Sequence, residues 1–173
     1  PTAGIELALR RCDLKHSDID LICFYWDDAG NLIKALKNEA KNVPRFGASV
    51  LPRMRSRISA ASSNREVVET LRAIWPCALP RVEFIDHHYA HARYAYLVSG
   101  YETSACLIVD GRGEFATASV YDCVDGRLSL RWQQGMPASL GYVYGAVTQH
   151  LGFEPLADEY RVMGLAPYGN DDT

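Results

Sequence analysis

The 173-residue sequence lacks any apolar run that approaches a membrane span, and it lacks a strong charge of either sign. A transmembrane helix needs about 20 consecutive apolar residues, so we expect no membrane-spanning helix. The formal net charge of −3 gives no overall reason to expect nucleic acid or an anionic membrane as a partner. Hydrophobic content of 48% and charged content of 23% are typical of a globular protein.

Cysteine pairs of the CxxC type are also missing. The five cysteines are odd in number, and two of them fall in strand-like runs. Secreted disulfide scaffolds and cysteine-based zinc sites are therefore not favoured. We expect reduced thiols in a cytoplasmic protein, at Cys12, Cys23, Cys77, Cys106 and Cys123.

Apolar periodicity predicts an alternation of helices and strands before Gly100 and a different order after it. Before it, the predicted elements are a helix at 2–12, a strand at 18–26, helices at 31–41 and 62–76, a strand at 81–86 and a helix at 87–99. After it, strands at 105–110, 115–122 and 127–133 precede helices at 139–153 and from 158.

The three later strands are expected to form an antiparallel meander. Asp125-Gly126 is a strong hairpin signal between the last two of them. In the last strand, Leu128, Leu130 and Trp132 are predicted to share one face. Three such strands followed by helices are typical of the opening of a ribonuclease-H-like unit.

Residues 42–64 form a basic segment that is interrupted by prolines and glycine. One interpretation is a solvated, partly helical excursion, which is the usual role of such charge-rich stretches. The other is a flap that attracts anions.

Three histidines crowd into five positions of the segment FIDHHYAHARYAY. His87 and His91 are four residues apart, so a helix would place both on one face with their Cβ atoms about 6 Å apart. That spacing lets two imidazoles bind one metal ion, as in the HExxH helix. His88 with His91 is an alternative pair, and ordinary hydrogen bonding at a helix start is a third interpretation. The spacing alone does not choose between them.

A carboxylate in the segment LIVDGRGE strengthens the metal interpretation. Asp110 ends an apolar strand and could join two histidines as a third ligand. Two histidines with one carboxylate suit iron, manganese or zinc and leave positions open for a substrate. Asp86 is either a further ligand or a group that orients a ligand imidazole.

The glycines after Asp110 have two interpretations. Gly111, Gly113 and Ala116 match the spacing GxGxxA, but the dinucleotide fingerprint requires a helix to follow. An alternating strand follows here, so a Rossmann site is excluded. A glycine-rich hairpin can still expose N–H groups that hold phosphate, or it can be a tight turn that needs positive φ.

Taken together, four segments resemble the NodU/CmcH-type carbamoyltransferases, which make carbamoylated nodulation factors and antibiotics. They are DHHYAHARYAY, LIVDGRGE, SLGYVYGAVTQHLGF and EYRVMGLAPYG, and the resemblance covers roughly residues 18–169. It implies an α/β, actin/Hsp70-like ATPase fold of ribonuclease-H-like sheets with flanking helices, incomplete at both ends. Residues 1–100 would be the latter part of the first subdomain, with the HxxxH helix, and residues 101–173 the start of the second.

The resemblance also implies the chemistry. A carbamoyl group would pass from carbamoyl-adenylate, made from carbamoyl phosphate and ATP by a C-terminal adenylate-forming domain, to a hydroxyl of a small-molecule acceptor. The metal ligands map to His87, His91 and Asp110. Iron is favoured, with manganese or zinc as alternatives. We expect Gly111, Arg112 and Gly113 to bind the cofactor, and His88 to act as the catalytic base.

Some family features are not found. A preceding strand with a His-Asp loop and a further metal-binding aspartate are missing, and Arg161 stands where the family usually has lysine. We therefore expect no turnover by these 173 residues alone. A homodimer is compatible with the sequence, and neither nucleic acid nor membrane is expected as a partner. The alternatives are a hydrogenase-maturation or tRNA threonylcarbamoyl-type relative, and a non-catalytic nucleotide-binding module of actin-like fold. Metal content together with binding of an ATP analogue would discriminate between them.

Overall fold

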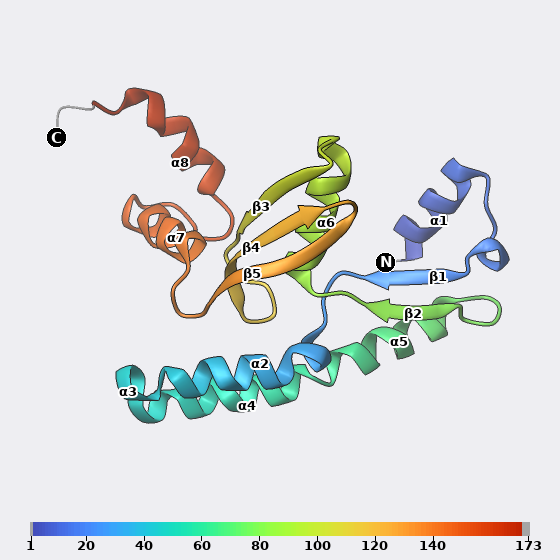
Figure 1. Ribbon diagram of the computed structural model, residues 1–173, viewed down its shortest axis with the longest axis horizontal. Coiled ribbons are helices and arrows are strands. Elements are labelled where there is room, and N and C mark those ends of the chain that lie inside the picture. Colours follow the sequence, from blue (N-terminus) through green and yellow to red (C-terminus); the bar gives the residue numbers. More distant parts are fainter. Residues whose placement is uncertain (1, 171–173) are drawn as a thin grey trace.

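Two small sheets organise the chain in the computed structural model, which describes residues 2–170 (Figure 1). The first sheet pairs β1 (Leu21–Phe24) with β2 (Arg81–Phe84) in parallel. The second is the antiparallel sheet β3-β4-β5. The protein is thus a mixed α/β chain, as the sequence predicts.

The connection between the two parallel strands is entirely helical. It contains α2 (Asp28–Lys41), α3 (Val43–Phe46), α4 (Val50–Ala60) and α5 (Ser63–Ile74), with the short 3₁₀ turn η2 (Gly47–Ser49) before α4. Helices α2 and α4 lie side by side as an antiparallel pair, and α5 runs on beneath the parallel strands (Figure 1). The basic segment 42–64 is therefore mostly helical and packs against α2. Helix α1 (Thr2–Cys12) and the turn η1 (His16–Asp18) precede β1.

The meander predicted after Gly100 is confirmed. Strand β3 (Thr103–Val109) pairs with β4 (Ala116–Val124), and β4 pairs with β5 (Arg127–Gly135), antiparallel in both cases. Asp125 and Gly126 join the last two strands with φ of 47° and 77°. Positive φ at both central residues is what a type I′ hairpin turn requires.

A small core lies between this sheet and α6 (His87–Ser99). Ala92 and Tyr96 of the helix meet Tyr121 and Cys123 of β4, and partly buried neighbours from the other two strands complete the cluster. Burial of each of the larger side chains in this cluster contributes about 1.5–3 kcal/mol to the stability of the fold. This packing fixes the start of α6 relative to the end of β3.

The prediction that three side chains of β5 share one face is wrong for one of them. Leu128 and Leu130 pair with Cys123 and Tyr121, but Trp132 pairs with Val120 because of a bulge at the intervening position. An extra residue in one strand reverses which face the next side chain takes. Trp132 therefore lies on the face away from α6, in a groove also lined by Val109 and Val143.

The chain continues into α7 (Leu140–His150), α8 (Glu159–Leu165) and the turn η3 (Ala166–Tyr168). Ser139 caps α7, because its hydroxyl accepts from the backbone N–H of Tyr142 at 3.1 Å. Among residues 2–170, no helix has both the length and the hydrophobicity that crossing a bilayer requires.

Candidate metal centre

The histidine segment begins α6 directly after the parallel strand β2. The Asp86 carboxylate caps this helix by accepting from the backbone N–H of Tyr89 at 2.9 Å. Sequence analysis considered Asp86 as a ligand or as a group that orients a ligand imidazole. The contact that the structure shows for it is this helix cap. With the helix start fixed, His87 and His91 lie one turn apart on the same side.

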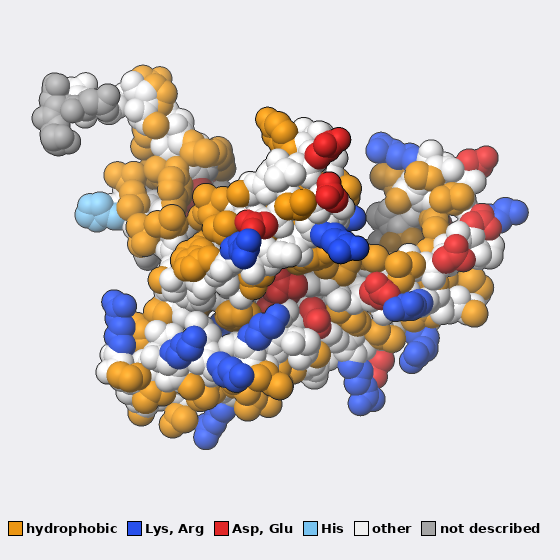
Figure 2. Space-filling view, viewed as in Figure 1, with side chains coloured by type: hydrophobic (Ala, Val, Ile, Leu, Met, Phe, Trp, Pro, Cys, Tyr) orange, Lys and Arg blue, Asp and Glu red, His pale blue; other side chains and the backbone are white. Residues whose placement is uncertain are grey.

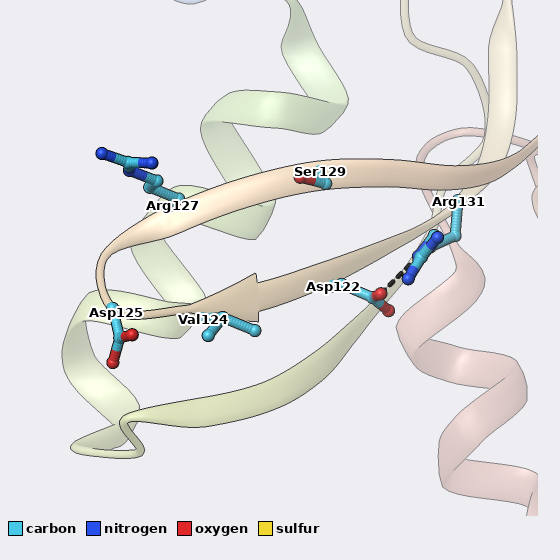
Figure 3. Close-up of a pocket in the computed structure, with 6 residues that line it drawn as sticks. All are labelled: Asp122, Val124, Asp125, Arg127, Ser129 and Arg131. Atoms are coloured by element: carbon cyan, nitrogen blue, oxygen red, sulfur yellow. Dashed lines mark hydrogen bonds and ion pairs between the residues drawn. The ribbon is translucent and has the colours of Figure 1, made fainter.

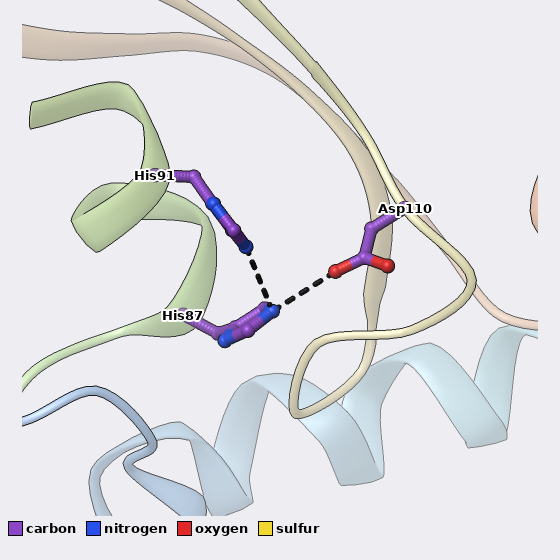
Figure 4. A group of neighbouring side chains, drawn as sticks. All are labelled: His87, His91 and Asp110. Atoms are coloured by element: carbon purple, nitrogen blue, oxygen red, sulfur yellow. Dashed lines mark hydrogen bonds and ion pairs between the residues drawn. The ribbon is translucent and has the colours of Figure 1, made fainter. Parts of the chain in front are cut away.

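Asp110 follows β3 and meets both histidines (Figure 4). Its Oδ2 lies 2.9 Å from Nε2 of His87, and that nitrogen lies 3.1 Å from Nε2 of His91. One ligand atom from each of the three residues can be chosen so that all lie within 4.8 Å of one another. Two ligand atoms on one ion are at most about 4.2 Å apart, so the group is close to a closed ligand set.

The orientation of the His87 ring favours a cation at this point. Its Nδ1 lies 3.3 Å from the carbonyl oxygen of Tyr25, which can only accept a hydrogen bond. In the tautomer that donates from Nδ1 to this carbonyl, Nε2 carries a lone pair. That lone pair faces a carboxylate oxygen and a second imidazole nitrogen. A metal ion placed where these atoms meet would bind all three, so the three residues fit a metal ion.

Aromatic side chains after β1 flank the same ring. The ring centroids of Tyr25 and Trp26 lie 5.8 and 4.9 Å from that of His87. The His87 side chain is only 12% exposed, and that of Asp110 is 33% exposed. His91 is exposed. One side of the group is therefore buried in protein, and the other is open to a substrate.

No role was predicted for Glu114. It is 2% exposed. Its Oε1 accepts from the backbone N–H of Asp27 at 2.7 Å and from that of His87 at 3.0 Å. Burial raises the pKa of Glu114, while these N–H groups lower it. Its position after Gly113 in LIVDGRGE was the available signal, because an acidic residue closing a glycine-rich turn is well placed to accept backbone N–H groups.

His88, the predicted base, lies in the core. It is 0% exposed, and its Nδ1 lies 2.7 Å from the Ser119 hydroxyl. Burial lowers the pKa of His88, against the raising effect of Asp86 and Asp110. Its other nitrogen has no hydrogen-bond partner among the described residues. The structure places His88 next to the candidate ligand His87 but out of reach of solvent, and its role as a base stays a prediction.

The glycine-rich turn uses its own N–H groups internally. The N–H of Gly111 donates to Oδ1 of Asp110 at 2.6 Å, and that of Gly113 donates to the carbonyl of Ala116 at 2.8 Å. Phosphate binding by these two N–H groups is untested, and it would require those bonds to open. Between them, the Arg112 side chain is exposed and lines a cavity on the other side of the turn.

A hollow of about 670 Å³ lies elsewhere, along the β4–β5 hairpin (Figure 3). Its lining is polar and includes the ion pair of Arg131 with Asp122. It contains none of the three metal-ligand candidates. Within residues 2–170, the His-His-Asp group is the one place where three potential metal-ligating side chains converge, so it is the candidate site.

Comparison with known proteins identifies the class of protein to which this chain belongs. A family model of the carbamoyltransferase N-terminus matches residues 1–173. The chain therefore belongs to the family of carbamoyltransferase N-terminal domains, and the resemblance found in its motifs is confirmed.

Among similar proteins, an uncharacterized protein of Synechocystis is 32% identical and covers 98% of this chain and 28% of that protein. The nodulation protein NolNO of Sinorhizobium fredii is 31% identical, over 98% of this chain and 23% of its own length. The nodulation protein NolO of Bradyrhizobium diazoefficiens is 37% identical over 51% of this chain and 16% of its length. The chain thus spans about a quarter of the length of the first two.

Proposed function

We propose that this chain supplies a metal centre for carbamoyl transfer to a hydroxyl group of a small molecule. The observation that carries the proposal is the convergence of His87, His91 and Asp110 in a chain of the carbamoyltransferase family. Iron suits this donor set best, with manganese or zinc as alternatives. The donor of the carbamoyl group would be carbamoyl-adenylate, formed from carbamoyl phosphate and ATP.

A metal ion held by these residues would supply positive charge for the oxygens that become more negative during transfer. The chain's own residues prepare the site. A hydrogen bond from Nδ1 of His87 to the Tyr25 carbonyl would leave Nε2 free, and Glu114 holds the backbone from which that ring projects. The partial exposure of Asp110 and the exposure of His91 leave one side open for the carbamoyl donor.

We extend the proposal to the fold and the assembly. An actin/Hsp70-like ATPase fold is supported by the antiparallel meander that is followed by helices, with a boundary near Gly100. Formation of the adenylate would require a separate catalytic domain. A cytoplasmic location is consistent with five free cysteines.

Metal content tests the proposal. Purified protein loaded with Fe(II) under anaerobic conditions should retain about one ion per chain after desalting. Asp110→Ala and His91→Ala should each lower metal affinity by more than about 100-fold, because loss of a group that merely hydrogen-bonds to a ligand already costs about 10- to 100-fold. His150→Ala is the matched control, since this histidine is exposed and outside the ligand group. Retention of a full metal complement by Asp110→Ala would refute the assignment.

A further inference from the structure

Helix α6 has a buried face next to the face that carries the candidate ligands. His88, Ala92 and Tyr96 are buried, at intervals of four residues. His87 and His91 each precede a buried residue by one position, and one residue turns a helix by about 100°. On the face drawn in Figure 2, no histidine side chain shows over α6 or the antiparallel sheet, which agrees with the burial of His88. The rotation of the buried face therefore decides where the two candidate ligands point.

A hydrogen bond to the sheet fixes this rotation at the start of the helix. Nδ1 of His88 lies 2.7 Å from the hydroxyl oxygen of Ser119 in β4, and both residues are 0% exposed. The amide nitrogen of Gln133 in β5 donates to the same hydroxyl at 3.2 Å. Among residues 2–170, the other ring nitrogen of His88 has no hydrogen-bond partner. The bond to Ser119 is therefore the polar contact that orients this ring.

The same stretch of β4 also holds Asp110. The backbone N–H of Asp110 donates to the carbonyl of Thr117 at 2.9 Å. Ser119 is paired with Ile108 of β3, two residues before Asp110. One short stretch of β4 thus contacts both parts of the candidate ligand set, which are the end of β3 with its aspartate and the first turn of α6 with its histidines.

The glycine-rich turn approaches the His88 ring as well. A Cβ atom at Gly113 would lie 3.1 Å from Cδ2 of His88 and 3.4 Å from Cβ of His87. The first of these distances is tighter than an ordinary contact, so glycine lets the turn come close to the helix here. The His88 ring therefore lies against both β4 and the turn that follows Asp110.

We propose that His88 and Ser119 form a positioning pair. Their hydrogen bond sets the rotation of the first turn of α6, so that His87 and His91 meet Asp110 at a metal ion. The inference rests on the proposed function, since it needs a metal ion at these residues. His88 acts here through the neighbouring ligands, a role that is separate from proton transfer. Removal of a group that orients metal ligands typically lowers metal affinity by about 10- to 100-fold.

Two variants of similar size at position 88 test the pair. His88→Asn keeps a polar atom where Nδ1 lies and can still bond to Ser119, whereas His88→Leu fills similar space without that bond. Each protein is titrated with Co(II), whose visible absorption spectrum reports the geometry of its ligands. His88→Leu should bind Co(II) about 10- to 100-fold more weakly than the wild type and show a changed spectrum. His88→Asn should restore the wild-type spectrum and most of the affinity.

Ser119→Ala removes the same bond from the other side and should resemble His88→Leu. The double variant should lose little more affinity than either single variant, because the two residues act through one contact. Cys123→Ala is the control for loosened packing, since Cys123 is 0% exposed on β4 and packs against the same helix. It should keep the wild-type Co(II) spectrum. If urea denaturation shows that His88→Leu does not fold, the comparison of Ser119→Ala with Cys123→Ala decides the question.

The outcomes separate this inference from the metal assignment. A wild-type spectrum and affinity in both His88→Leu and Ser119→Ala would overturn the positioning pair and leave the metal assignment intact. Equal losses in His88→Asn and His88→Leu would also overturn it, as would the same spectral change in Cys123→Ala, because packing in general would then be the cause. Failure of the wild type to bind Co(II) would overturn both proposals.

Discussion

Two carboxylates stand at the two ends of one short turn, and their surroundings differ. Asp110 opens the turn and is partly exposed, with Oδ2 directed at the His87 ring. Glu114 closes the turn and is almost fully buried, with Oε1 accepting two backbone N–H groups. Asp110 thus meets a side-chain nitrogen and the N–H of its own neighbour Gly111, whereas Glu114 meets main-chain donors from two distant segments.

The difference separates a candidate ligand from a positioning residue. A metal ligand needs a free lone pair and access from outside, and Asp110 has both. Glu114 gives its oxygen to the chain after β1 and to the first residue of α6, so it joins two segments that carry parts of the site. Its backbone carbonyl also accepts from Arg57. Removing either carboxylate should therefore have different consequences.

The largest expected effect on stability comes from exchanging these carboxylates for alanine. Glu114→Ala should lower the free energy of unfolding by about 3 kcal/mol, because it leaves the N–H groups of Asp27 and His87 without their acceptor. Asp110→Ala should change it by less than about 1 kcal/mol, the usual limit for a partly exposed polar group. Urea denaturation monitored by tryptophan fluorescence measures both values.

A matched variant keeps this test informative if Glu114→Ala does not fold. Glu114→Gln retains an acceptor oxygen and should lose less stability than the alanine variant. Equal losses in Glu114→Ala and Asp110→Ala would remove the distinction between the two ends of the turn.

Sequence analysis identified Asp110 as a candidate site residue and missed Glu114, for a physical reason. The spacing of His87 and His91 on a helix and the position of Asp110 after a strand are local properties. Local periodicity is what a single sequence expresses well. Glu114 instead binds the N–H of Asp27, 87 positions away. Such a contact depends on how β1, α6 and the turn pack, so the local signal after Gly113 could indicate an acceptor but not its distant partner.

The bulge in β5 shows the same limit. Alternation predicted one face for Leu128, Leu130 and Trp132, and it holds for the first two. The extra residue before Trp132 has no clear signature in the sequence. Likewise, the burial of His88 depends on the sheet packing against α6, which the histidine segment alone does not reveal.

A close backbone contact between Gly141 of α7 and Gly111, next to Asp110, allows a further test of the turn. A Cβ atom at Gly141 would lie 2.6 Å from Cα and 2.8 Å from N of Gly111, which are backbone atoms that cannot rotate away. Gly141→Ala should therefore push the turn from α7 and lower stability by about 1–3 kcal/mol. It should also weaken metal binding, because Asp110 precedes Gly111. Thermal denaturation and metal titration measure the two effects.

Gly145→Ala is the control on the same helix. The atom nearest to its Cβ would be a Glu159 side-chain oxygen at 3.7 Å, which is an ordinary contact. Alanine is also better than glycine in a helix by about 1 kcal/mol, so this variant should keep or gain stability. Weaker metal binding in Gly145→Ala than in Gly141→Ala would contradict a local effect on the turn.

The smallest expected effect is a change in the pH dependence of stability, and it concerns Tyr121, which lies outside the turn. Like Glu114, and unlike Asp110, this residue is almost fully buried. Burial raises the pKa of Tyr121 far above its ordinary value of 10.0, with Asp86 and Glu114 adding to the rise. Above pH 10 the unfolded chain then loses the Tyr121 proton while the folded chain keeps it. The stability that this residue contributes is present below pH 10 and declines as the pH rises.

The difference in free energy of unfolding between the wild type and Tyr121→Phe should therefore shrink by about 1.4 kcal/mol per pH unit above pH 10. Urea denaturation of both proteins between pH 9 and pH 11 measures this slope, and parallel curves would show that burial does not hold the phenol in its neutral form.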